Sequence, residues 1–309
     1  MRRHIVLVSA LAAALTIRPD AAARTDSPSM APAGRPGFER YHYSLNARVR
    51  PLVVFWISRA NVGDAVATRS VGSEGASYSL LIGSDPDRAP LHINRWGYIE
   101  EEVHGGDARL IGLMTESDED SIEQAEASVR RQASGRHAFK FIQGTADRDQ
   151  SHSRVTSIAA PADYTLRQLR TVLDLGRQSP EWRPRSVRLP PGARPGFLTA
   201  LVESMHSGSA APITYVYYGR LYELRRLRAE AISNFRLSRT EYGPAIGADY
   251  LVTSSYDGER TRFSMTYGTR APFAEVPLRV VYQPRWWMEV ELTIDDTRDV
   301  GPLMDGAAR

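Results

Sequence analysis

The sequence contains no cysteine, and this absence excludes several chemistries. Without a thiol the chain can form no disulfide, cannot use a thiolate nucleophile and cannot bind zinc through sulfur. Lysine is nearly absent too: of 39 basic residues, Lys140 alone is lysine and the rest are arginine. The arginines are spread among 36 acidic residues, so the concentrated positive face needed for non-specific nucleic-acid binding is missing. We therefore expect no nucleic-acid partner.

Short catalytic and nucleotide-binding signatures are also missing. The chain has no Gly-x-Ser-x-Gly elbow, Walker loop, His-Glu-x-x-His helix or Gly-x-Gly-x-x-Gly turn. Glu203 and His206 have the i, i+3 spacing that di-metal bundles use twice, but this pair occurs once. We therefore predict no catalytic residue, no metal site and no cofactor, and we favour binding over catalysis.

Long hydrophobic runs are missing except near the amino terminus. Basic residues 2–4 precede an uncharged run of 13 residues, Ile5–Ile17, and the small residues Ala21–Ala23 follow. This layout is typical of a secretory signal peptide, and at about 1.5 Å per residue the run is too short to cross a roughly 30 Å hydrocarbon core. We expect residues 1–23 to be removed, which lowers the net charge from +3 to +1 by taking away three Arg and one Asp. The product is then a periplasmic or extracellular protein that does not span the membrane.

The remaining chain divides by composition. Residues 24–37 are rich in Pro, Gly, Ser and Ala and are predicted to be a flexible linker. We predict an N-terminal α+β region over residues 38–160, a helical and proline-rich connector over 161–210, and a C-terminal antiparallel β region over 211–309. Five prolines between residues 179 and 196 predict irregular structure there.

Alternation of apolar and polar residues is the main signal for secondary structure. From Tyr41 to Ile57 the odd positions are apolar except for Pro51, and the even positions become apolar after Arg50. This pattern predicts a strand that becomes buried on both faces. Further strands are predicted at Tyr78–Ile82, His92–Glu102, Arg109–Met114, Phe139–Gln143, Arg154–Ala159 and Thr214–Ala229, and helices at 115–134, 163–177 and 196–206. The fold class is therefore α+β, predominantly antiparallel β-sheet with a few helices.

The pair Asp257-Gly258 predicts a two-residue hairpin turn between Tyr250–Tyr256 and Glu259–Tyr267. Pairing outward from this turn places Val252 opposite Phe263 and Tyr250 opposite Met265. The apolar side chains then share one face of the hairpin and the polar ones share the other, as a half-buried sheet requires.

Large aromatic side chains are concentrated in the strands. In the stretch Val276–Asp295, Trp286 falls on the apolar face and Trp287 on the wetter one, and the tyrosines of residues 215–222 also occupy both faces. Such residues either pack across strands to stiffen a sheet or line a concave surface for an apolar ligand. The ligand-binding candidates are Tyr217, Tyr222, Trp287 and Trp96.

The segment FSMTYGTRAPFAEVPLRVVYQPRWWMEVELTID, residues 263–295, resembles the closing strands of bacterial envelope β-sheet families related to the lipoprotein-carrier clamshell. Its motif is the step Val276-Pro277-Leu278. The resemblance covers about a tenth of the chain. It implies a half-barrel in the C-terminal part, with helices across its concave side and an apolar ligand between, without catalysis.

These observations favour an exported, non-enzymatic protein that binds a lipid, another hydrophobic small molecule or an envelope protein. The alternative is a hydrolase whose site combines a histidine with a carboxylate from a distant segment. That alternative requires His92, His152 or His206 to lie within about 3 Å of a carboxylate inside a cleft. A purely structural role remains a third interpretation.

Overall fold

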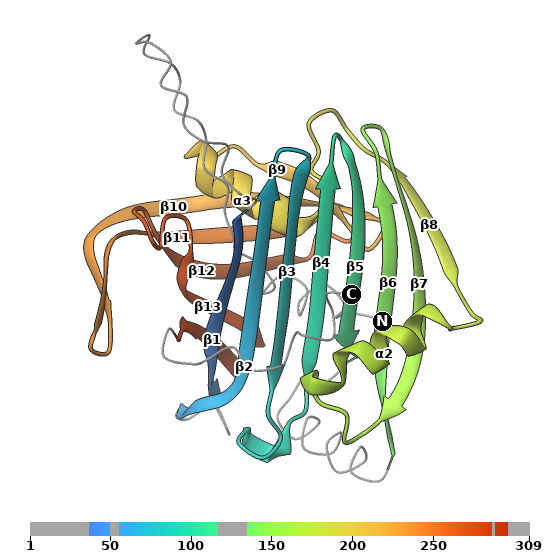
Figure 1. Cartoon of the computed structure of the whole chain (residues 1–309), viewed down its shortest axis with the longest axis horizontal. Helices are drawn as coiled ribbons and strands as arrows, with labels where there is room; N and C mark the ends of the chain where they lie inside the picture. Colours follow the sequence, from blue (N-terminus) through green and yellow to red (C-terminus); the bar gives the residue numbers. More distant parts are fainter. Residues whose placement is uncertain (1–36, 50–55, 117–134, 286–287, 296–309) are drawn as a thin grey trace.

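A computed structural model describes residues 37–49, 56–116, 135–285 and 288–295, and strands dominate this part of the chain (Figure 1). The strands are β1 (Gly37–Val49), β2 (Ile57–Gly72), β3 (Gly75–Ser84), β4 (Trp96–His104), β5 (Asp107–Thr115), β6 (Arg136–Ala146), β7 (Gln150–Pro161), β8 (Arg183–Arg188), β9 (Ile213–Tyr217), β10 (Arg220–Leu237), β11 (Thr240–Ser254), β12 (Arg260–Gly268), β13 (Pro277–Arg285) and β14 (Met288–Ile294). The helices are η2 (Pro90–His92), η3 (Leu166–Gln168), α2 (Leu169–Arg177) and α3 (Phe197–Ser207). The predicted α+β class, dominated by antiparallel sheet, is confirmed.

All these strands form one open sheet made of two meanders. From β1 to β8 and from β9 to β14 each strand pairs with its neighbour in sequence, and the strand order is β8-β7-β6-β5-β4-β3-β2-β1-β14-β13-β12-β11-β10-β9. The meanders join where β1 pairs antiparallel with β14, in a register that sets Tyr43 opposite Ile294 and Val49 opposite Met288. The strands before and after the connector therefore belong to a single sheet.

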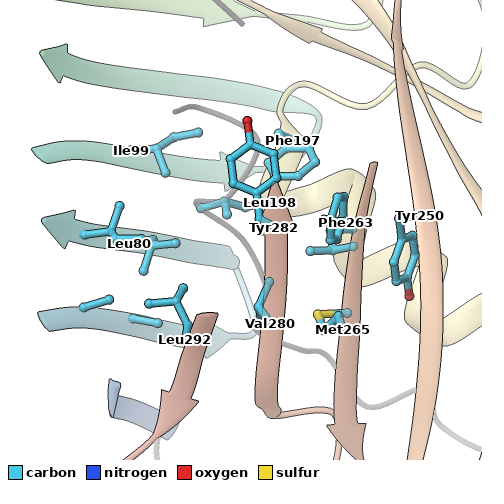
Figure 2. Close-up of a cluster of buried hydrophobic side chains, with 14 of the residues drawn as sticks. Leu80, Ile99, Phe197, Leu198, Tyr250, Phe263, Met265, Val280, Tyr282 and Leu292 are labelled. Carbon is cyan, nitrogen blue, oxygen red and sulfur yellow. The ribbon is translucent and has the colours of Figure 1, made fainter. Parts of the chain in front are cut away.

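The sheet folds over so that its two meanders face each other. In Figure 1, strands β10 to β13 run across the strands of the first meander, and α3 lies over the same side. The side chains between the two meanders form the larger hydrophobic cluster, which we call the inner cluster. Figure 2 shows Leu80 and Ile99 of the first meander facing Val280 and Leu292 of the second.

A second cluster, which we call the outer cluster, covers the opposite face of the first meander. There, α2 and η3 bury Leu169, Val172 and Leu173 against side chains of β2 to β6. The strands of the first meander have helices on one face and the second meander on the other, so both of their faces are apolar. Successive residues therefore point into different clusters: Leu80 lies in the inner cluster and Leu81 in the outer one. This arrangement explains the unbroken apolar runs in the first half of the chain.

Helix α3 is buried on most of its surface, and its amino terminus is capped from another strand. Its own N-cap residue, Gly196, has no side chain to offer. The carboxylate of Glu101, fully buried on β4, accepts hydrogen bonds from the backbone N–H groups of Leu198 (2.8 Å) and Thr199 (2.9 Å) and from the Thr199 hydroxyl (2.8 Å). A Cβ at position 196 would overlap this carboxylate. Burial raises the pKa of Glu101, although these hydrogen bonds oppose the rise.

In the described part of the chain, no helix combines the length and the apolar character needed to cross a membrane.

Several predicted elements agree with the structure: β3, β5, β6, β7, α2 and α3 cover the predicted segments with changes at their ends. The predicted helix over 115–134 falls largely on residues 117–134, which lie outside the described residues. The predicted strand Tyr41–Ile57 corresponds to β1, which ends at Val49, and the next described strand begins at Ile57.

The predicted register of the β11–β12 hairpin is wrong by two residues. Val252 lies opposite Thr261, and Tyr250 lies opposite Phe263. The connection is longer than predicted because Tyr256 belongs to the turn, where 71% of it is exposed, and Gly258 N–H donates to the Ser254 carbonyl at 2.9 Å. A shift of two residues preserves the faces, so Val252 and Phe263 both still lie in the inner cluster.

Three further predictions were wrong. The proline-rich segment 179–196 contains strand β8, because at the edge of a sheet a proline such as Pro184 need not donate to a ladder. The predicted strand Thr214–Ala229 is a hairpin, since Tyr218 and Gly219 both have positive φ and turn the chain between β9 and β10. Strand β4 begins at Trp96 rather than at His92, which lies in η2.

We expect replacement of Glu101 by Ala to lower the free energy of unfolding by about 2–4 kcal/mol, because it removes hydrogen bonds to a charged group and leaves buried N–H groups of α3 unpaired. Chemical denaturation measures the change. The control is Glu102→Ala, one residue along the same strand and less buried. Equal effects from the two variants would show that the cap does not hold α3.

We expect His137 to make the fold sensitive to acid. Burial, and secondarily the charge of Arg95, lowers the pKa of His137 to about 4, whereas an unfolded chain has a histidine pKa of about 6.5. The unfolded state then binds a proton first, so stability is lost as the pH falls from about 6.5 to about 4, by roughly 3 kcal/mol at 1.36 kcal/mol per pKa unit. His137→Leu should flatten this part of the pH profile, whereas His152→Leu, at an exposed position, should not.

Candidate functional site

Tyrosine is the distinctive residue of the inner cluster. Of the chain's 14 tyrosines, ten are buried there: Tyr43, Tyr78, Tyr215, Tyr217, Tyr218, Tyr222, Tyr242, Tyr250, Tyr267 and Tyr282. Several are stacked on other rings, among them Tyr215 on Tyr222 (centroids 5.4 Å apart) and Tyr250 on Phe263 (4.9 Å). Burial raises the pKa of the Tyr43 and Tyr78 hydroxyls, so at physiological pH they remain neutral hydrogen-bond donors.

Some of these hydroxyls have no hydrogen-bond partner among the described residues. The hydroxyl oxygens of Tyr43 and Tyr78 are buried and form no hydrogen bond within the described chain. Tyr78 is 1% exposed and lies in the inner cluster together with side chains of α3. An unsatisfied buried hydroxyl costs roughly 1–3 kcal/mol, and native interiors contain few such groups.

A buried arginine lies in the same cluster. On β10 the side chains of Tyr222, Leu224 and Arg226 are buried in alternation, and Arg226 is 7% exposed. The register with β11 shifts directly after it, between Arg226 and Arg228, and the intervening Leu227 is 46% exposed. Such a bulge breaks the alternation of the two faces. Arg226 is the last buried residue of β10.

Arg226 lies opposite Tyr250 of β11 in the sheet register, and its charge acts on the hydroxyls of Tyr250 and Tyr267, the first of which is near Ser204. Burial raises the pKa of both tyrosines, and the positive charge of Arg226 opposes this rise in each. Tyr267 is close enough to Arg226 and Tyr250, and Tyr250 to Ser204, for weak hydrogen bonding, but neither tyrosine hydroxyl forms a hydrogen bond of good geometry with a described residue. We call these four residues the arginine site.

No described residue forms an ion pair with Arg226, because the carboxylates around α3 are engaged elsewhere. Oε1 of Glu275 lies 2.9 Å from Nδ1 of His206, in the last turn of α3. Glu203 binds Arg194 through both carboxylate oxygens. Glu101 caps the opposite end of the helix. The arginine site therefore contains an arginine, 7% exposed, with which these carboxylates form no ion pair.

The alternative of a hydrolase depended on a histidine beside a carboxylate. His92 Nδ1 contacts the Pro86 carbonyl and His152 Nδ1 contacts the Ser186 hydroxyl, each at 2.9 Å. His206 alone of the three lies within about 3 Å of a carboxylate, yet both its ring nitrogens are buried. A general base must reach the proton it removes. The pair His206–Glu275 ties the end of α3 to the segment before β13.

The predicted ligand-binding residues separate in space. Tyr217 and Tyr222 both lie in the inner cluster, 6% and 2% exposed. Trp96 lies in the outer cluster beneath η3 and α2, and its indole N–H donates to the Tyr164 carbonyl at 3.2 Å. Trp287 lies outside the described residues. The structure thus brings two of the four together and places Trp96 on the other face of the sheet.

The arginine site was not predicted from the sequence. A signal for it exists in the alternation Tyr222, Leu224, Arg226, where an arginine continues an apolar face. Recognising the anomaly requires knowing that this face is buried, which the sequence of β10 alone does not determine.

Comparison with protein-family models, curated proteins and solved structures finds no match for this chain. The resemblance of residues 263–295 to the lipoprotein-carrier clamshell therefore stays a prediction. Function has to be argued from the inner cluster itself.

We expect Arg226→Met to raise the free energy of unfolding by about 1–3 kcal/mol, because it replaces a buried charge lacking an ionic partner with an apolar side chain of similar length. Chemical denaturation in the absence of any added ligand measures the effect. Arg225→Met is the matched control, at the neighbouring exposed position, and should change stability by less than about 0.5 kcal/mol. A clear loss of stability in Arg226→Met would show instead that the arginine supports the fold.

Proposed function

We propose that the protein is exported and, without catalysis, binds a lipid-like molecule with an apolar body and a polar end between the two meanders of its sheet. The observation that carries this proposal is that the buried hydroxyls of Tyr43 and Tyr78 form no hydrogen bond with any residue that the structure describes. The signal-like start of the sequence supports export.

The chemistry of the inner cluster suits such a ligand better than it suits a dry core. A core that serves only to stabilise a fold is improved by Phe in place of an unsatisfied Tyr, since the ring is retained and the cost of burying the hydroxyl disappears. Binding sites for small molecules, in contrast, combine apolar and aromatic walls with a few polar groups that fix orientation. The inner cluster has this composition.

Helix α3 provides the element around which such a site can form. It presents Phe197 and Leu198 to the cluster, where Phe197 contacts Tyr215 (centroids 5.4 Å apart) and Phe263 (6.3 Å) (Figure 2). The helix is held at both ends by polar contacts, Glu101 at its start and Glu275 at its end. A ligand that displaces apolar side chains around α3 would still leave these anchors in place.

The experiment uses the full chain and the fluorescent fatty acid cis-parinaric acid, whose emission rises in an apolar environment. We expect saturable binding at one site in the wild type. Tyr78→Phe should weaken that binding about two- to tenfold, the range of one hydrogen bond, while leaving stability unchanged or increased. A structural tyrosine would instead lose stability when its hydroxyl is removed.

Tyr98→Phe is the matched control. Tyr98 is buried in the outer cluster, and its hydroxyl lies near Glu100 and Ser79 and is not among the buried hydroxyls that lack a partner. This variant should lose about 1 kcal/mol of stability and bind the probe as the wild type does. The proposal is rejected if the wild type shows no saturable binding, or if both variants weaken binding equally.

A further inference from the structure

We infer that the ligand is anionic and that its carboxylate or phosphate group binds the arginine site. This inference rests on the proposed function and names the chemical class of the ligand. Its basis is the position of Arg226, a residue that is 7% exposed, opposite Tyr250 of β11 in the sheet register. The hydroxyls of Tyr250 and Tyr267 are buried and form no hydrogen bond of good geometry with a described residue.

The charge of the arginine site is the first step. A buried arginine is rare unless it is paired, because removing a charge from water is costly. Each carboxylate that borders α3 has another partner: Glu101 the helix N–H groups, Glu203 the side chain of Arg194, and Glu275 that of His206. An anionic group on the ligand would neutralise Arg226 without rearranging any of these pairs.

The hydrogen-bonding capacity of the site is the second step. A guanidinium carries five N–H donors in a planar fork that matches the two oxygens of a carboxylate or phosphate. The hydroxyls of Tyr250 and Tyr267 add two further donors, neither of which has a well-formed hydrogen bond to a described residue. A group made of acceptors only would satisfy these donors, whereas a neutral alcohol would leave the charge unpaired.

The position of the site is the third step. A Cβ placed on Gly208, which has φ of 63° directly after α3, would lie 3.8 Å from Nη2 of Arg226. The segment from Ser207 to Pro212 is exposed, so the guanidinium lies near the surface end of the inner cluster. Tyr250 also stacks on Phe263, which contacts Phe197 of α3. An amphiphile can therefore place its anionic end near the surface at Arg226 and its apolar chain along the rings toward α3.

The test measures displacement of cis-parinaric acid from the full chain by three molecules with the same oleoyl-length chain. Oleate carries a carboxylate, oleoyl lysophosphatidate carries a phosphate, and oleyl alcohol carries no charge. We expect at least one of the two anions to compete at least tenfold better than the alcohol, as a charge-assisted hydrogen bond predicts. The better of the two anions identifies the head group.

Substitutions then assign the preference to the arginine site. Arg226→Met should reduce the preference for the anion to less than about threefold while oleyl alcohol competes as before, and Arg226→Lys should retain part of it. Arg225→Met, at the exposed neighbouring position, is the matched control and should behave as the wild type. If Arg226→Met does not fold, Tyr267→Phe provides the second variant and should reduce the preference about two- to tenfold.

The outcomes separate this inference from the proposed function. If the probe binds but anions and alcohol compete equally in the wild type, the ligand site stands and its anionic specificity is overturned. A preference that survives in both Arg226→Met and Tyr267→Phe also overturns it, because the charge would then be bound elsewhere. If the probe does not bind at all, both proposals fail.

Discussion

The pairing of β1 with β14 is the constraint on which the rest of the structure depends. Seven residues of each strand face each other, from Tyr43 opposite Ile294 to Val49 opposite Met288. In addition to the backbone pairing, the side chains of Arg48 and Glu289 form an ion pair at 2.9 Å and the Ser44 hydroxyl donates to the Asp295 carboxylate at 2.9 Å. These contacts join segments about 240 to 250 residues apart. Without them the two meanders would be separate sheets, each with an apolar face open to water.

The same pairing determines how the interior is filled. Because the meanders meet at the middle of the sheet and fold toward each other, the side chains between them come from both halves of the chain and from α3. Closing loops of this length is entropically costly before the contacts that reward it exist. We therefore expect the local hairpins of each meander to form early in folding. Helix α3 is capped by Glu101 of the first meander, and it gives the second meander a surface on which to assemble.

The local elements could largely be predicted from the sequence, whereas their assembly could not. Period-two alternation located strands such as β5 and β7, and the spacing of Leu169, Val172 and Leu173 located α2, because each pattern is repeated within one element. The register of β11 with β12 failed because Tyr256 is apolar enough to continue a strand but lies exposed in the turn. Turn geometry, unlike alternation, depends on a few backbone angles that the side chains of this segment specify weakly.

The contrast between predictable local features and unpredictable assembly is stronger for the candidate site. Sequence patterns singled out Tyr217 and Tyr222, which do lie in the inner cluster, and equally Trp96, which lies in the outer one. Both faces of the first meander are buried, so an aromatic residue in these strands does not reveal which cluster it joins. Arg226 was missed because its significance lies in the hydroxyls that β11 and β12 bring near it. Those neighbours come together only when the two meanders have folded over α3.

Arg226 and the unpaired tyrosines have a common physical meaning. Each costs stability in the free protein, since burying a charge or a hydroxyl without a partner is unfavourable. A chain selected for stability alone would have an apolar residue at position 226 and phenylalanine at positions 43 and 78. In most proteins such costs are concentrated at functional sites, where a ligand supplies the missing partner. Tyr43 and Tyr78 both lie in the inner cluster, and the carboxylates of Glu101, Glu203 and Glu275 are engaged with other partners. Under the proposed function, the interior of the folded sheet is the place where the chain gives up stability for recognition of a ligand.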